Sequence, residues 1–167
     1  KSEMSNGFNP PRWLTTSVVG LLLLLHFGLA VSSVRYKSNT FDEIIHLTAG
    51  YTYWKFNDYR FQPENGNLPQ RWVPLPLLLQ SQAFPEIVHN VWDAGHEFFF
   101  KLGNDPEAML HWGRIMVVLL SMALGFVVFL ISRNLFGPLG GIISLILYAF
   151  SPTMLAHGRL TTSDMAA

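Results

Sequence analysis

An uncharged apolar run near the start of the chain limits its fold more than any other feature. Residues 13–34 contain no Asp, Glu, Lys or Arg, and five consecutive leucines stand at their centre. At about 1.5 Å per residue, a helix of this length crosses the roughly 30 Å hydrocarbon core of a bilayer. A cleaved signal peptide would have a shorter apolar region and a small-x-small cleavage site, which is not evident near Ser32. We therefore predict a transmembrane helix over residues 13–34.

Two later apolar stretches, residues 113–133 and 138–156, predict a second and a third transmembrane helix. Ser132-Arg133-Asn134 together with Gly137-Pro138 predicts a tight turn between them, and Ser151-Pro152 is expected to distort the third helix or end it early. Half of the residues are hydrophobic and only 13% are charged, which is unlike an ordinary soluble domain. The zero net charge and the lack of a dense basic patch argue against a nucleic-acid partner.

Residues 35–112 form a long loop between the first two predicted spans and hold most of the charged side chains. Helices are expected over residues 42–56 and 86–102. Two prolines make residues 72–84 an interfacial or re-entrant segment instead. Asp105 followed by Pro106 and Glu107 predicts the start of another helix.

The predicted fold is therefore an all-α integral membrane protein with three transmembrane helices. It forms a single membrane unit over residues 1–167, with a large amphipathic loop packed on one membrane surface. Residues 157–167 would begin a second loop on the same side of the bilayer. The chain begins with Lys and ends without a structural stop signal, so we expect it to be part of a longer protein.

An acidic pair, Asp42-Glu43, stands just after the first predicted span. Thr40 and Glu43 fit the S/T-x-x-E capping box, so a helix is expected to begin here with both acids in its first turn. His46 lies three and four positions further on and should share a face with both acids. Taken alone, this pattern favours a solvated, helix-capping pair on an amphipathic helix that lies on the membrane.

A longer set of residues resembles a known superfamily. The acidic pair is followed by His46-Leu-Thr-Ala-Gly-Tyr and by Asp58-Tyr-Arg, and the chain closes with His157-Gly-Arg and Thr162-Ser-Asp. These stretches resemble the polyprenyl-phosphate-dependent glycosyltransferases of the GT-C superfamily. The most similar branches are the protein mannosyltransferases and the ArnT-type aminoarabinose transferases. The resemblance covers nearly the whole chain but only the first part of such an enzyme.

This resemblance implies a role for each conspicuous charged residue. Asp42 would be the base that takes a proton from the acceptor hydroxyl, with Glu43 beside it and Asp164 as a second acidic site. Arg159, and with it Arg60 or Arg71, would hold the lipid phosphate, because a guanidinium matches phosphate oxygens bidentately. The partners implied are membrane lipid, a lipid-linked sugar donor and other subunits of a membrane complex.

The resemblance also leads us to expect a cytoplasmic (inner) membrane location, with residues 35–112 on the periplasmic or lumenal side. A divalent cofactor such as Mg or Mn would be ligated by Asp42, Asp164 and His46. By itself Glu43-x-x-His46 is too small a ligand set, since a metal needs three or four ligands. The intramembrane His26 is expected to be a packed, hydrogen-bonded residue. The alternative to an enzyme is a non-catalytic transmembrane subunit or scaffold.

Overall fold

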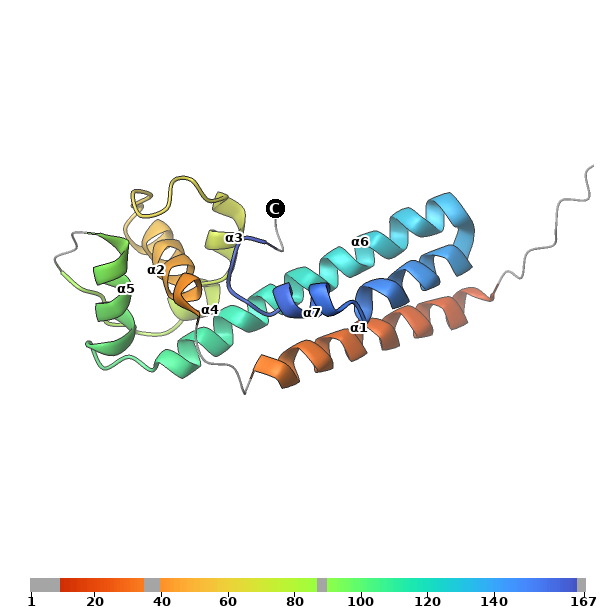
Figure 1. The fold of residues 1–167 in the computed structure, drawn as a ribbon, viewed down its shortest axis with the longest axis horizontal. Helices are drawn as coiled ribbons and strands as arrows, with labels where there is room; N and C mark the ends of the chain where they lie inside the picture. Colours follow the sequence, from red (N-terminus) through yellow and green to blue (C-terminus); the bar gives the residue numbers. More distant parts are fainter. Residues whose placement is uncertain (1–9, 35–39, 87–89, 165–167) are drawn as a thin grey trace, which may run out of the picture.

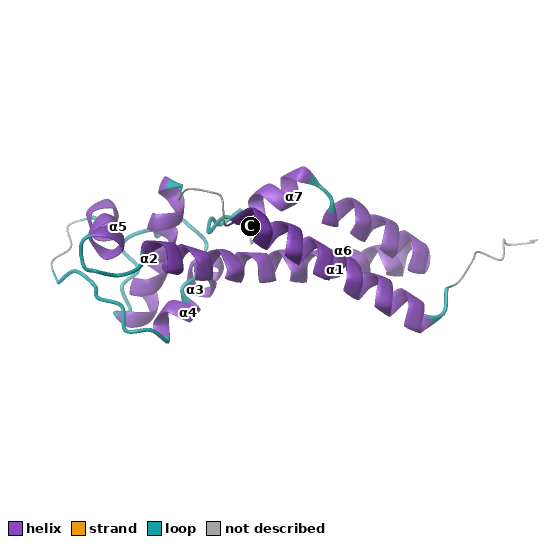
Figure 2. Cartoon of the chain, turned by 90° about the horizontal axis from the view of Figure 1, so that it is seen from below, coloured by secondary structure: helices purple, strands orange, loops and turns teal. Residues whose placement is uncertain are grey.

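The computed structural model describes residues 10–34, 40–86 and 90–164, and within these ranges the secondary structure is entirely helical. The helices are α1 (Arg12–Val34), α2 (Phe41–Lys55), α3 (Asn67–Trp72), α4 (Leu75–Leu78), α5 (Val91–Phe100), α6 (Pro106–Ala149) and α7 (Pro152–His157). The short helices α2 to α5 gather at one end of the long helices α1 and α6 (Figures 1 and 2).

Two helices, α1 and α6, are long and apolar enough to cross a membrane. In the most apolar window of α1 only 28% of the residues are buried, and in that of α6 only 33%. Large side chains such as Leu24 and Leu147 are therefore exposed along both helices. An apolar surface of this length is unfavourable in water and is satisfied by lipid. The two helices therefore indicate a membrane protein, and α1 matches the span predicted over residues 13–34.

The helix α6 reverses direction at Gly137. Asp105 caps its first turn, as predicted, by accepting a hydrogen bond from the N–H of Ala108 at 3.0 Å. The backbone of Gly137 has φ 75° and ψ −179°, a conformation that a glycine adopts without the steric cost of a side chain. Pro138 follows, and the last part of α6 runs back beside the first (Figure 1). The predicted turn thus occurs at Gly137, while residues 132–134 remain helical.

A small apolar core joins α1 to both arms of α6. Val19 and Leu22 of α1 contact Phe129 of the outgoing arm and Leu145 of the returning arm. The returning arm ends at Ala149, so the expected distortion near Ser151-Pro152 is present as a helix end. A new short helix, α7, begins directly after it.

His26 stabilises this helix end inside the apolar bundle. Its Nδ1 donates to the carbonyl oxygen of Ala149 at 3.1 Å, and its Nε2 accepts from the hydroxyl of Ser121 at 2.8 Å. A carbonyl only accepts hydrogen bonds, which places the imidazole proton on Nδ1. The last carbonyls of a helix have no partner within the helix, and His26 supplies one where water is scarce. The predicted packed, hydrogen-bonded role of His26 is the one found.

The helix α2 lies inside the end cluster rather than on its surface. Leu47 and Tyr51 of α2 form a core with Phe98 of α5 and Val117 of α6. Nearly every residue from Ile45 to Tyr53 is buried. An amphipathic helix resting on the membrane was expected, but α2 is covered on nearly all sides because α3, α4, α5 and α6 all pack against it.

The other loop predictions are met in part. Residues 72–84 were expected to lie at the interface, yet Val73 and Leu77 are buried in the cluster core. The helix expected over residues 86–102 is present as the shorter helix α5. Residues 87–89 of the expected range lie outside the described residues. Within the described part, the predicted loop thus forms a small helical cluster that shares its core with α6.

Candidate functional site

The acidic pair at the start of α2 is divided between two environments. Asp42 is exposed, whereas Glu43 is completely buried. Neighbouring residues on a helix point in different directions, because one turn takes about 3.6 residues. Of the two predicted acids, only Asp42 presents its carboxylate to solvent or to a substrate.

The carboxylate of Glu43 joins three segments that are distant in sequence. Its Oε1 accepts a hydrogen bond from Arg114 Nε at 2.8 Å, and its Oε2 accepts one from Arg114 Nη2 at 2.6 Å. The backbone N–H and the hydroxyl of Thr40 donate to Oε2 at 3.0 and 3.1 Å, which forms the predicted capping box. The N–H of Thr161 donates to Oε1 at 3.2 Å. The same carboxylate thus holds α2, α6 and residues 158–164 together.

These hydrogen bonds keep Glu43 ionised. Burial by itself would raise its pKa, because it disfavours the charged form. Hydrogen bonds from Arg114 and from the Thr40 N–H oppose burial, and the net pKa is lowered from 4.5. With both oxygens already bonded, Glu43 positions its neighbours and has no free lone pair directed at a substrate.

His46, one turn further along α2 than Glu43, is buried and contacts other polar side chains. Its Nδ1 lies 3.4 Å from Nε2 of Gln70, and that amide also donates to Oε1 of Gln62. An amide nitrogen only donates, so Nδ1 of His46 accepts and the imidazole proton is on Nε2. The Oε1 of Gln70 is buried and has no hydrogen-bond partner among the described residues.

Three carboxylates act on His46 from different parts of the chain. Burial lowers the pKa of His46, whereas the negative charges of Asp42, Asp164 and Glu64 each raise it, and the net pKa is below 6.5. A charge influences another group in this way only when the two lie close together. Asp42 and Asp164 therefore both contribute to the electrostatic environment of His46.

The segment over residues 158–164 carries two of the predicted site residues. Asp164 is exposed, and its Oδ2 accepts from the Thr162 hydroxyl at 3.0 Å and lies 3.1 Å from Nδ1 of His157. Arg159 is partly buried, and its Nε has no hydrogen-bond partner in the described part of the chain. A buried N–H without a partner is costly, so this group is suited to an acceptor supplied from outside.

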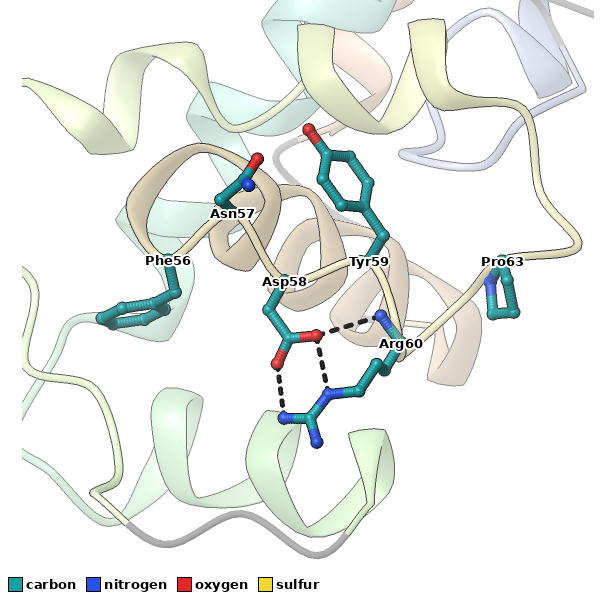
Figure 3. Close-up of a pocket in the computed structure, with 6 residues that line it drawn as sticks. All are labelled: Phe56, Asn57, Asp58, Tyr59, Arg60 and Pro63. Carbon is teal, nitrogen blue, oxygen red and sulfur yellow. Dashed lines mark hydrogen bonds and ion pairs between the residues drawn. The ribbon is translucent and has the colours of Figure 1, made fainter.

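The other two predicted arginines, Arg71 and Arg60, differ in burial and in their hydrogen-bond partners. Arg71, at the end of α3, donates to the hydroxyl of Tyr59, and its guanidinium lies 4.9 Å from the ring centre of Trp54. Its Nε is buried and likewise has no partner within the described ranges. Arg60 instead forms an ion pair with Asp58 on the outer surface (Figure 3). Arg71 and Arg159 thus keep an unpartnered N–H, while Arg60 already has a carboxylate.

The predicted metal ligands Asp42, Asp164 and His46 are not gathered into one ligand group in the described part of the chain. Among the residues that the structure describes, no group of three or more His, Asp or Glu side chains is arranged to hold an ion. Asp42, Asp164 and His46 share an electrostatic environment without forming a ligand set, so we derive no chemical step through a metal, and the predicted Mg or Mn stays a prediction.

Sequence reasoning missed the residues that hold the site together. Arg114, Thr161 and Gln70 were not predicted as site residues. A signal for Arg114 was present, because it lies in a largely apolar helix, where a charged side chain is seldom buried without a partner. No such signal marks Thr161 or Gln70.

No protein-family model, curated protein or solved structure matches this chain. The functional argument therefore depends on the residue pattern and on the geometry described above.

Proposed function

We propose that this chain is the N-terminal part of a GT-C glycosyltransferase, which moves a sugar from a polyprenyl phosphate to an acceptor hydroxyl. The observation that carries the proposal is the hydrogen bond from the Thr161 N–H to the buried carboxylate of Glu43, at 3.2 Å, which holds the segment of Arg159 and Asp164 against the start of α2, where Asp42 lies. A transferase of this kind needs acids and a phosphate-binding cation at one water-exposed rim. The segment that carries Asp164 also carries Arg159, with its unpartnered Nε.

In this proposal Asp42 is the catalytic base. Its exposed carboxylate takes the proton from the acceptor hydroxyl, and the resulting oxygen nucleophile attacks the anomeric carbon. The bond between that carbon and the phosphate oxygen breaks, and the polyprenyl phosphate leaves with both electrons. Arg159 and Arg71 stabilise the departing phosphate through their unpartnered N–H groups. Arg60 is less suited to this task, because Asp58 already occupies its guanidinium.

Glu43 and Arg114 act as positioning residues. Their ion pair, together with the Thr161 hydrogen bond, fixes the segment of Arg159 and Asp164 against the start of α2. The separation between the acids and the phosphate site is thereby set by buried contacts. Movement of this segment would misplace the phosphate and slow the reaction even though no reacting group had changed.

The membrane arrangement is the remaining part of the proposal. We assign residues 138–157 as a broken third span, formed by the returning arm of α6 and by α7. The support for it is the reversal at Gly137 and the hydrogen bond from His26 that satisfies the helix end. The α2 to α5 cluster then lies on the extracytoplasmic surface of a cytoplasmic membrane, with residues 158–164 on the same side.

The test is sugar transfer by the full-length protein, followed as consumption of a lipid-linked sugar. Asp42→Asn should abolish transfer, and Arg159→Gln should weaken it, while both variants insert into the membrane normally. Glu107→Gln, an exposed carboxylate at the start of α6, is the matched control and should transfer at the normal rate. Full activity of Asp42→Asn would remove Asp42 from the role of base.

The non-catalytic alternative is a subunit or scaffold of a larger membrane assembly. Its support is that the hollow over residues 56–63 is lined by Arg60 but by neither Asp42 nor Arg159. A coding frame that stops at Ala167 would favour this alternative, and one that continues into many further spans would favour the transferase.

A further inference from the structure

A shallow hollow lies on the outer surface of the end cluster, where the chain leaves α2. It has a volume of about 810 Å³, and its lining residues are Phe56, Asn57, Asp58, Tyr59, Arg60 and Pro63. The ring of Phe56 and the Asp58–Arg60 pair reach to one side of this segment, whereas Tyr59 points to the other (Figure 3). The predicted and proposed transferase roles use none of these residues except Arg60.

The segment is held firmly although it has no regular secondary structure. Thr52, itself buried, donates from its hydroxyl to the carbonyl oxygen of Asp58 at 3.1 Å and accepts the N–H of Asp58 on its own carbonyl at 3.3 Å. The hydroxyl of Tyr53 donates to the carbonyl oxygen of Gln62 at 3.0 Å. The Tyr53 and Tyr59 rings stack with centres 4.7 Å apart. A ligand at this surface would meet side chains whose backbone is already fixed, which lowers the entropy cost of binding.

The ion pair in the hollow is well formed but contributes little to folding. Arg60 donates to Asp58 from Nε at 2.9 Å and from Nη2 at 2.7 Å, and its backbone N–H donates at 3.1 Å. The Arg60 side chain is 82% exposed and that of Asp58 is 20% exposed. Exposed ion pairs contribute little to stability, so stability alone does not explain three hydrogen bonds between these two residues.

The charge of the pair indicates which ligands suit it. The hydrogen bond from Arg60 lowers the pKa of Asp58, so both groups stay ionised near neutral pH. The other lining residues are uncharged, and the hollow has no net charge. Asp58 largely neutralises the charge of Arg60, so the pair attracts a phosphate less strongly than a lone guanidinium would and a cation less strongly than a lone carboxylate would. Neutral hydroxyls can instead accept from the outer N–H groups of the guanidinium and donate to the carboxylate lone pairs.

Phe56 provides an apolar surface beside these polar groups. Its side chain is 54% exposed, and its ring is held 5.1 Å from the ring centre of Phe84. An exposed aromatic face next to a few fixed polar groups is the usual combination in sites that orient small ligands. Sugars present C–H groups on one face and hydroxyls around the edge, which matches the two halves of this surface.

We propose that the hollow over residues 56–63 binds a neutral carbohydrate, with its hydroxyls on the Asp58–Arg60 pair and its apolar face on Phe56. The binding itself needs no transferase chemistry. Only the further step, that this carbohydrate is the acceptor, depends on the proposed function. The same loop continues to Gln62, whose side chain accepts a hydrogen bond from Gln70, and Gln70 lies 3.4 Å from His46, so a sugar bound here would approach the residues around His46.

The experiment measures binding by the detergent-solubilised full chain to an array of neutral glucose, mannose and galactose oligosaccharides and their phosphorylated forms. No sugar donor is present, so the result is independent of transfer. The variants are Arg60→Gln and Phe56→Leu, both at exposed positions that should not affect folding. The matched control is Lys101→Gln, which removes the cation of another exposed ion pair, 3.8 Å from Glu97.

We expect at least one neutral oligosaccharide to bind, and inorganic phosphate not to compete with it. Arg60→Gln should weaken this binding about tenfold, because it removes the charged hydrogen-bond donor. Phe56→Leu should weaken it by about the same factor, because it removes the aromatic face on which the sugar packs. The control should bind as the unmodified chain does. The proposal is overturned if only phosphorylated sugars bind, if no neutral oligosaccharide binds, or if Arg60→Gln and Phe56→Leu bind as tightly as the control.

Discussion

Glu43 and Arg114 are joined by hydrogen bonds of 2.8 and 2.6 Å although 71 positions separate them in the sequence. Both side chains are almost completely buried. Removing one partner of such a pair leaves an uncompensated charge and typically costs about 3–5 kcal/mol. Arg114 also donates to the carbonyl oxygen of Val34, at 3.4 Å, so the pair ties the end of α1 to the end cluster as well.

Replacing either member of this pair should therefore strongly destabilise the protein. Glu43→Gln and Arg114→Met should each lower the free energy of unfolding by about 3–5 kcal/mol in a denaturant titration in micelles. The double variant Glu43→Gln/Arg114→Met should lose clearly less than the sum, because neither charge is then left alone. Strict additivity of the two single changes would contradict a direct interaction.

The same carboxylate should make stability fall in acid. The folded pKa of Glu43 lies below 4.5, so the unfolded chain takes up the proton first as the pH decreases. The contribution of Glu43 is complete above about pH 4.5 and is lost as the pH falls through the folded pKa. The unfolding free energy measured from pH 7 to pH 2 should fall less steeply in Glu43→Gln. Equal slopes in the two proteins would show that Glu43 does not titrate in this way.

The convergence of distant acids on His46 can be measured directly. Asp42→Asn and Asp164→Asn each remove a negative charge that raises the pKa of His46. In an NMR titration of the histidine ring signals, either variant should therefore lower the pKa of His46. Glu107→Gln removes a carboxylate that is not among the charges acting on His46, and it should leave this pKa unchanged. An unchanged His46 pKa in Asp164→Asn would separate residues 158–164 from α2.

The contact between α2 and α3 depends on Gly50. A Cβ atom at this position would overlap the carbonyl oxygen of Gln70 and lie 3.0 Å from Cγ of Pro74. Gly50→Ala should therefore destabilise the protein by about 1–3 kcal/mol through overpacking. Gly28→Ala is the matched change in another helix, and nothing lies within 4 Å of its Cβ position. It should be neutral or stabilising by up to about 1 kcal/mol, and equal effects of the two changes would refute the close contact.

Local features of this fold could be predicted from the sequence. Residues 13–34 are apolar without interruption, Thr40 and Glu43 have the spacing of a capping box, and Asp105 precedes a proline at a helix start. Each of these signals acts over a few neighbouring residues, and the structure has a helix or a cap at each. The turn at Gly137 was predicted for the same reason.

The features that were missed depend on contacts between distant segments. The amphipathic pattern of residues 42–56 indicated one buried face, but nothing in it reveals that several helices cover the others. Likewise, the spacing that made Glu43 a cap also made it look like an exposed partner of Asp42. Its burial follows from Arg114 and Thr161, which approach only when the chain has folded. Tertiary contacts thus decided which acid faces solvent.

The final prediction concerns the polar contacts inside the apolar bundle. His26→Ala would leave the carbonyl of Ala149 and the hydroxyl of Ser121 without their ring partner, at a cost of about 1–3 kcal/mol for each buried group that stays unsatisfied. The hydroxyl of Tyr148 lies 3.0 Å from that of Ser121 and can compensate in part. We therefore expect a loss near 1–3 kcal/mol in total, together with faster amide hydrogen exchange over α7, since the helix end that precedes α7 is no longer held. His96→Ala, at an exposed position of α5, should change neither quantity. If His26→Ala were as stable as His96→Ala and exchanged at the same rate over α7, the hydrogen bond from His26 would not be what holds the end of α6 in place.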